Sequence, residues 1–207
     1  MPTLLHPGTK QRVLFVHVPR TAGRFINENL LLNGIISEQD NIYGEIDGTQ
    51  IDHFHQDLYE KHLNVQDIPQ FGIVRDPVER FYSASSFLLH EYGNKIEKDL
   101  KSYKKFTKLI NTLINTQANN WFRPQHEFFS SHTKKWKFED GFEESFFNWL
   151  SDIFSTEVIK KKHSFEPNFW DGKKIEKDDI ITNKIKKFYR RDYEWQRIIR
   201  QIWGRHG

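Results

Sequence analysis

Arginine, hydroxyl and small side chains gather where an apolar segment breaks at Pro19. The residues that follow are Arg20, Thr21, Ala22 and Gly23. A turn of this kind before a helix offers backbone N–H groups and the positive end of the helix dipole. Ala22 and Gly23 let an anion approach the backbone, and Arg20 adds forked, charged donors. The segment therefore predicts a site for a phosphate-like anion; an ordinary turn with Arg20 in solvent is the open alternative.

A second basic position, Arg75, ends another apolar segment and is followed by a helix start. Asp76 suits the N-cap, and Glu79 suits a capping box. Arg80 and Ser83 share a predicted polar face with Asp76, because they lie one and two helical turns further on. We expect Arg75 and Ser83 to hold one anion together. In the alternative interpretation, Arg75 pairs with a carboxylate and Ser83 is a small packing residue.

The elements that position these residues alternate along the chain. Alternating strands and helices are typical of a mostly parallel sheet with right-handed crossovers. No repeat or linker interrupts the pattern, so a single domain over residues 1–207 is predicted. The predicted strands are 12–18, 70–75 and 134–139; the predicted helices are 24–33, 57–63, 95–118, 143–154, 184–203 and one that starts at Asp76; residues 1–11 are predicted to be a polar lead.

Composition excludes several classes of protein. The 31 Lys and Arg against 28 Asp and Glu give a net charge of +3, too small for a polybasic nucleic-acid binder. There is no cysteine, which excludes disulfides, thiolate metal sites and cysteine nucleophiles. No apolar run reaches the roughly 18–20 residues of a membrane span, and residues 1–10 lack a signal-peptide core. A cytoplasmic chain without a membrane segment is expected.

Together, the two anion segments resemble the nucleotide-binding elements of sulfotransferases that use 3′-phosphoadenosine 5′-phosphosulfate (PAPS). The family's 5′-phosphosulfate loop is similar to FVHVPRTAGRF (15–25), and its 3′-phosphate element R-D-P-x-E-R-x-x-S is similar to IVRDPVERFYSAS (73–85). The carbohydrate sulfotransferase branch matches these motifs best. The resemblance implies an α/β, P-loop-like three-layer fold with a central parallel sheet flanked by helices, and PAPS as donor with 3′-phosphoadenosine 5′-phosphate (PAP) as product. The nucleotide contacts that it implies are Arg20, Thr21, Ala22, Gly23, Arg24, Phe25, Arg75 and Ser83.

The chain departs from the family motif at two places in the first loop. Arg20 stands where the family has lysine, which keeps the charge and changes its geometry. Arg24 and Phe25 replace the usual Thr-Ser pair. Hydroxyl contacts to the phosphosulfate are therefore missing, and backbone amides have to serve in their place.

Sulfuryl transfer to a hydroxyl needs a group that accepts the hydroxyl proton, and histidine is the side chain that does this most often. His53 and His55 form an H-x-H motif between the two anion segments, and in an extended segment both would point to one side. The motif resembles the H-x-H of uronyl 2-O-sulfotransferases, which implies that His55 is the base and that His53 lies beside it. Two solvated histidines are the alternative. No metal site is predicted, because the motif lacks a convincing third ligand.

Other residues are weaker candidates for the site. His17 is expected to be a buried, hydrogen-bonded strand residue, while His126 lines an acceptor cleft or lies on the surface. Glu127 and Glu139 are further candidate bases. Lysine clusters at 160–162 and 173–174 suit either an anionic acceptor or a solvated loop. Trp121 and Trp170 lie in predicted loops, where stacking on sugar rings is the alternative to core packing.

The sequence thus predicts a PAPS-dependent O-sulfotransferase that acts on a glycan or a similar hydroxyl acceptor, with Arg20, His53 and His55 as its catalytic residues. A nucleotide kinase-like phosphotransferase is one alternative, although the loop lacks the pattern G-x-x-x-x-G-K-[ST]. A non-catalytic nucleotide- or glycan-binding module is the other, because Arg24 and Phe25 depart from the family motif.

Overall fold

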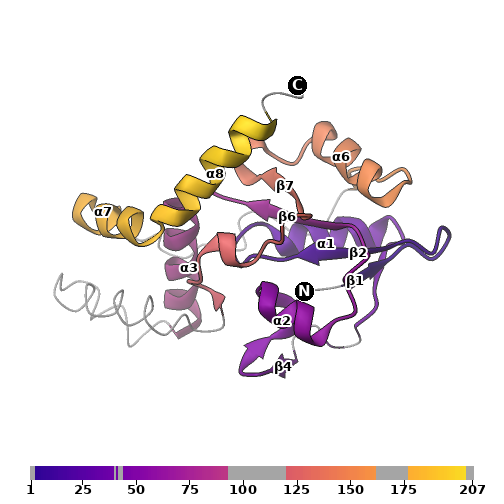
Figure 1. Cartoon of the computed structure of the whole chain (residues 1–207), viewed down its shortest axis with the longest axis horizontal. Coiled ribbons are helices and arrows are strands. Elements are labelled where there is room, and N and C mark those ends of the chain that lie inside the picture. The colour runs from indigo at the N-terminus through magenta and orange to yellow at the C-terminus, as the bar shows by residue number, and fades with distance from the viewer. Residues whose placement is uncertain (1–2, 40, 42–43, 93–119, 162–176, 204–207) are drawn as a thin grey trace. The chain divides into compact units, whose positions relative to one another are not determined.

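The computed structural model describes residues 3–39, 41, 44–92, 120–161 and 177–203 (Figure 1). The helix expected over 95–118 lies outside these residues. Internal contacts group the chain into two compact units. The first unit comprises 1–75, 119–121 and 128–170, and the second comprises 76–118, 122–127 and 171–207. The single domain expected over residues 1–207 stays a prediction.

The first unit is built on a five-stranded sheet in the order β3–β1–β2–β6–β7 (Figure 1). Strands β2, β6 and β7 pair in parallel, as predicted, whereas β1 is antiparallel to β2 and β3. Of these described strands, β1 alone runs against the others, so the sheet is mostly parallel. The polar lead predicted for residues 1–11 was wrong, because Leu4 pairs in β1 and is buried in the core. The strands are β1 (Thr3–Leu5), β2 (Arg12–Val16), β3 (Ile36–Ser37), β6 (Gln70–Val74) and β7 (Lys134–Lys137).

One face of this sheet carries the hydrophobic core, which packs against α1 (Gly23–Leu32) and α6 (Glu144–Phe154). Side chains alternate between the faces of a strand, so Phe15 and Phe71 point to this face and stack with their ring centroids 4.8 Å apart. Both helices were predicted, and α1 ends at Leu32, two residues before Gly34, whose φ of 79° suits a glycine stop. The helices contribute Ile26, Leu30, Phe146, Phe147, Leu150, Ile153 and Phe154 to the core.

Smaller elements of the first unit connect β3 to β6 and follow β7. Among them, α2 lies on the other side of the sheet from α6 (Figure 1), so helices flank the sheet. The predicted helix near 57–63 is confirmed as α2. These elements are β4 (Glu45–Ile46), β5 (Thr49–Gln50), the 3₁₀ helix η1 (Ile51–His53), α2 (Gln56–His62) and the 3₁₀ helix η4 (Phe138–Asp140).

The second unit is helical in its described residues. It contains α3 (Pro77–Tyr92), the 3₁₀ helix η3 (Gln125–Glu127), α7 (Asp179–Phe188) and α8 (Arg190–Trp203). The N-cap predicted at Asp76 is confirmed, since its Oδ1 accepts the N–H groups of Val78 at 2.9 Å and Glu79 at 3.0 Å. The carboxylate of Glu79 accepts a hydrogen bond from Lys177.

The prediction of one helix over 184–203 was wrong, because the C-terminal segment forms two helices. The first of its two helices, α7, begins earlier, after Asp178, whose Oδ1 caps the N–H groups of Ile180 and Ile181. The helical structure is interrupted at Tyr189, between α7 and α8. Tyr189 is buried, and its hydroxyl donates to Phe122 O at 2.6 Å. The pattern of apolar residues continues through Tyr189, so it does not reveal where α7 ends.

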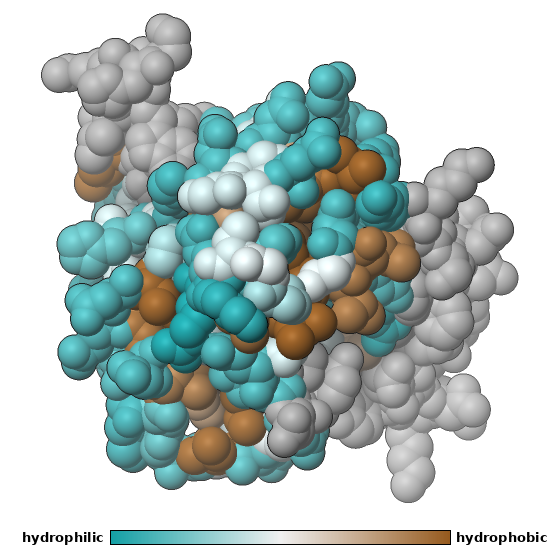
Figure 2. All heavy atoms as spheres, turned by 90° about the vertical axis from the view of Figure 1, so that its right-hand side faces the viewer, coloured by the Kyte–Doolittle hydropathy of each residue, from teal (hydrophilic) through white to brown (hydrophobic). Residues whose placement is uncertain are grey.

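The surface of the molecule is mixed in polarity. Figure 2 shows one face, on which apolar residues lie among hydrophilic ones. Exposed apolar side chains in the first unit are Leu31, Leu32, Ile36 and Ile159, a normal feature of folded proteins. None of the helices in the described ranges combines the length and the apolar character that a bilayer crossing requires.

Candidate functional site

The loop between β2 and α1 has an unusual backbone. Arg20 and Ala22 have φ angles of 66° and 68°, in the left-handed region that residues with side chains seldom adopt. Thr21 is buried between them, and its hydroxyl donates to Val18 O at 2.7 Å. Ala22 is the N-cap of α1 and provides no side-chain cap. The first N–H groups of α1 therefore form the kind of backbone cradle that binds anions.

Gly23, the first residue of α1, lies against the imidazole of His17. A Cβ at Gly23 would fall 1.9 Å from Nε2 and 2.3 Å from Cδ2 of that ring, so only glycine fits here without displacing it. His17 directly follows β2, and its ring stacks on Phe15 with centroids 5.4 Å apart. The prediction of a buried, hydrogen-bonded strand residue was right only for the burial: the His17 side chain is 12% exposed, but the residue lies just beyond β2 and its Nδ1 makes no hydrogen bond to the described residues. The His17 ring thus packs directly against the first residue of α1.

Three arginines give this loop a concentrated positive charge. Burial, together with the nearby charges of Arg75 and Arg24, lowers the pKa of Arg20 to about 10. The guanidinium of Arg75 donates from Nη1 to Arg20 O at 3.1 Å and lies 4.2 Å from the ring centroid of Phe138. Like charges at close range repel one another, and an anion bound beside them reduces that repulsion. The loop is therefore suited to a ligand with several negative charges.

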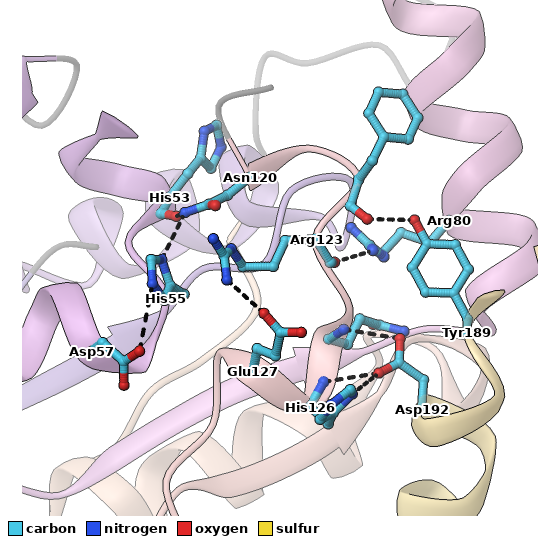
Figure 3. A network of polar contacts seen from close by, with 12 residues as sticks. His53, His55, Asp57, Arg80, Asn120, Arg123, His126, Glu127, Tyr189 and Asp192 are labelled. Atoms are coloured by element: carbon cyan, nitrogen blue, oxygen red, sulfur yellow. Dashed lines mark hydrogen bonds and ion pairs between the residues drawn. The ribbon is translucent and has the colours of Figure 1, made fainter. Parts of the chain in front are cut away.

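The two histidines of the H-x-H motif have different surroundings. The extended conformation expected for this segment was wrong, because His53 ends η1 whereas His55 is the N-cap of α2. Asn120 links them: its Nδ2 donates to His53 O at 2.8 Å and to His55 Nδ1 at 3.2 Å (Figure 3). On the other side of the ring, His55 Nε2 lies 3.9 Å from Oδ2 of the exposed Asp57. With Nδ1 as the acceptor, a neutral His55 carries its proton on Nε2.

A buried cluster of His17, Asp52 and His53 lies beside this motif. The carboxylate of Asp52 is 3.8 Å from His17 Nδ1 and 3.4 Å from His53 Nδ1. Burial lowers the pKa of His17 to about 3 and that of His53 well below its usual value, and it raises the pKa of Asp52 to about 6. Both imidazoles are therefore neutral near pH 7. Asp52 was not among the predicted site residues, although it directly precedes the H-x-H motif, which was a usable signal.

In the second unit, the prediction that Arg80 lies on a polar face of α3 was wrong. Its side chain is fully buried, and Nη2 donates to Arg123 O at 2.7 Å. The guanidinium also lies 5.6 Å from the ring centroid of Tyr189. A carbonyl and an aromatic face thus stabilise a charge that would otherwise be unfavourable inside the protein. Ser83 is half-buried on α3, and its joint hold with Arg75 on one anion stays a prediction.

The other candidate bases in the second unit are engaged in ion pairs. His126 Nδ1 lies 2.6 Å from Oδ1 of the fully buried Asp192 (Figure 3). Asp192 also accepts the backbone N–H groups of Gln125 and His126, and its hydrogen bond raises the pKa of His126. Glu127 accepts from Arg123 Nη1 at 2.5 Å. Asp192 therefore holds η3 in place, a role that was not predicted from the sequence.

The remaining candidates are only partly within the described residues. Trp121 is half-buried and packs edge-on against the ring of His53, with centroids 5.7 Å apart. Glu139 is exposed on η4. Lys160 pairs with Glu143 at 2.6 Å. Lys162, Trp170 and the lysines at 173–174 lie outside the described residues.

Comparison with known protein families gives a match that is consistent with the cationic loop after β2. A model described as the sulfotransferase family matches residues 8–202, a range that contains both arginine-bearing segments and the H-x-H motif. Searches of curated proteins and of solved structures gave no significant match. Because the family model spans nearly the whole chain, and because the chain folds as helices around a mostly parallel sheet with a cationic loop after β2, this protein belongs to the sulfotransferase family and is a transferase.

Proposed function

We propose that this chain transfers the sulfuryl group of PAPS to a hydroxyl of a carbohydrate or a similar acceptor. The observation that carries the proposal is the gathering of Arg20, Arg24 and Arg75 at the start of α1, where their charges act on one another. PAPS carries negative charge at its phosphosulfate and at its 3′-phosphate. It therefore matches this loop better than an uncharged or singly charged ligand does.

In this proposal the phosphosulfate binds the backbone N–H groups of residues 21–25 at the start of α1. Thr21 contributes through its backbone, because its hydroxyl proton is already donated to Val18 O. Arg20 lies at the bridging oxygen between phosphorus and sulfur. Negative charge grows on that oxygen as the S–O bond breaks, so Arg20 stabilises the transition state more than the bound donor.

The acceptor oxygen forms a bond to sulfur while the bond from sulfur to the leaving phosphate breaks. His55 takes the acceptor proton at Nδ1, the nitrogen that Asn120 faces, so the acceptor hydroxyl replaces the Asn120 amide there. The resulting imidazolium directs its Nε2–H toward Asp57. Asp57 stabilises it only weakly, because an exposed carboxylate is well screened by water.

The remaining assigned residues hold the site in place. His53, buried beside Asp52, positions the segment that carries His55 rather than contacting the acceptor. Arg75 and Ser83 bind the 3′-phosphate, an assignment that rests on the sequence motif R-D-P-x-E-R-x-x-S. The H-x-H motif favours an acceptor of the uronic-acid type within the carbohydrate class.

The first experiment titrates the chain calorimetrically with PAP, ATP and ADP, with and without magnesium. PAP binding that needs no magnesium supports the proposal, whereas magnesium-dependent ATP binding favours a kinase-like phosphotransferase. Sulfate transfer from labelled PAPS to a panel of glycans is then measured. PAP binding without transfer to any of them favours a non-catalytic module, consistent with the loss of two hydroxyls at Arg24 and Phe25.

Variants in the same assay test the residue roles. His55→Ala is expected to keep PAP affinity and to lose about 10²–10⁴-fold in turnover, the usual contribution of a positioned base. Arg20→Ala is expected to reduce turnover more than PAP affinity. His132→Ala, at an exposed histidine of the same unit, is the control and retains parental turnover. Near-parental turnover of His55→Ala would show that another residue is the base. The residues to test next would be His53, His126 and Glu127.

A further inference from the structure

Three potential metal ligands converge beneath the start of α1. His17 follows β2, and Asp52 and His53 belong to η1. Each offers one nitrogen or oxygen atom, and these atoms lie within 4.8 Å of one another. Two of the separations are short, at 3.4 Å from His53 Nδ1 to Asp52 Oδ1 and 3.8 Å from His17 Nδ1 to Asp52 Oδ2. Residues about 35 positions apart in the sequence are thus brought to a single point.

The polar atoms at this point are buried without hydrogen-bond partners. Among the described residues, His17 Nδ1, Asp52 Oδ1 and His53 Nδ1 are all inaccessible to solvent and accept or donate no hydrogen bond. Buried polar atoms are nearly always satisfied, and leaving one unpaired costs about 1–3 kcal/mol. Three such atoms so close together are unfavourable unless a further group contacts them.

The separations suit a small cation. Zn²⁺ binds imidazole nitrogen and carboxylate oxygen at about 2.0–2.2 Å, so neighbouring ligand atoms in a tetrahedral site are about 3.3–3.6 Å apart. The 3.4 Å separation matches this range, and the 3.8 Å separation, which ends on the other oxygen of Asp52, slightly exceeds it. The ligand atoms of the cluster lie within 4.8 Å of one another, so a bound ion draws the three side chains closer together. Two imidazoles and one carboxylate are also a common ligand set for divalent transition metals, and they leave a position open for water.

We infer that His17, Asp52 and His53 form a binding site for one divalent transition-metal ion, with Zn²⁺ as the best match. The ion joins η1 to the segment after β2. It fixes the His17 ring in the place that Gly23 leaves open for it, so it also orders the loop at the start of α1. Phe15 stacks on the His17 ring and Trp121 lies edge-on to the His53 ring, which gives the site apolar walls. The inference concerns structure and does not depend on PAPS as donor.

The test uses the full chain, untagged and stripped of metal with a chelator. Zn²⁺ is titrated calorimetrically, and Co²⁺ is titrated while its visible absorption is recorded, because d–d bands report its coordination. One ion per chain is expected, with a melting temperature that rises with metal concentration. Nitrogen-15 spectra of the imidazoles give a second readout, in which two of the ten histidines respond to Zn²⁺. Absence of stoichiometric binding to the parent chain would overturn the inference and would indicate that water fills the space.

Asp52→Asn is the decisive variant, because it keeps the shape of the side chain and removes its charge. Loss of a ligand is expected to weaken Zn²⁺ binding by more than the roughly 10–100-fold typical of outer-shell changes. His62→Ala is the matched control, because His62 also lies beside a carboxylate of the first unit, with Nε2 2.9 Å from Asp47 Oδ2. This pair differs from the proposed site, since Lys61 pairs with the same carboxylate and the Asp47 side chain is 47% exposed. Unchanged affinity in Asp52→Asn, or an equal loss in His62→Ala, would place the ion elsewhere.

Discussion

Replacing Gly23 by alanine tests the packing beneath the candidate donor loop. The new methyl group would lie 1.9 Å from Nε2 and 2.4 Å from Cε1 of His17, far inside van der Waals contact. The His17 ring has little room to move, because it stacks on Phe15 and is tilted against His53 with ring centroids 5.0 Å apart. The substitution therefore forces either the ring or the first turn of α1 to shift.

The expected free-energy change combines two opposing effects. An added methyl group in a well-packed site destabilises by about 1–3 kcal/mol. Alanine in a helix is better than glycine by about 0.5–1 kcal/mol, and Gly23 is not among the residues with positive φ, so the backbone itself accepts alanine. In the parent chain the clash dominates and Gly23→Ala destabilises. In a His17→Ala background the clash is gone, and the same substitution becomes neutral or slightly stabilising.

A double-mutant cycle measured by urea unfolding at constant pH and in excess chelator checks this reasoning. We expect a coupling free energy between Gly23→Ala and His17→Ala of at least about 1 kcal/mol, within the range for residues in contact. Gly72→Ala is the control, because its methyl group would meet Phe129 at 2.4 Å and the Val16 carbonyl at 2.7 Å, obstacles that truncating His17 leaves in place. Additivity of the Gly23 and His17 substitutions within about 0.5 kcal/mol would show that the ring does not occupy this position.

Two further predictions concern single residues. Arg75→Ala is expected to weaken PAP binding by about 1.5–3 kcal/mol, the range for hydrogen bonds to charged groups. Binding of adenosine 5′-phosphosulfate, which lacks the 3′-phosphate, should stay almost unchanged. Equal losses for both ligands in calorimetry would argue against a contact between Arg75 and the 3′-phosphate. The hydrogen bond from Asp192 raises the pKa of His126 in the folded protein, so its stabilisation is complete below pH about 6.5 and is lost as the pH rises through the folded pKa. Relative to His126→Asn, the free energy of unfolding of the parent should therefore fall over that window, by no more than about 1.4 kcal/mol per pH unit, and parallel pH profiles would contradict it.

Features that depend on neighbouring residues were predictable from the sequence. The β-branched run 12–16 and the run 70–74 form strands, and Asp76 caps the helix that follows, because these preferences act within a few residues. The turn before α1 was recognisable for the same reason, since Pro19 to Gly23 are consecutive. Its left-handed angles at Arg20 and Ala22 were not, because only the surrounding contacts hold non-glycine residues there.

Features that depend on distant residues required the tertiary structure. Arg80 looked like a surface residue of α3, yet the carbonyl of Arg123 and the ring of Tyr189 bury it. Asp52 gained its place beside His17 only because η1 folds back toward the end of β2. Local patterns specify which element forms, whereas the partner that satisfies a buried charge comes from wherever the fold brings the chain together. The sequence therefore determined the strands β2 and β6, the cap at Asp76 and the turn before α1, and the tertiary structure decided which charged and polar side chains became buried and what they contact.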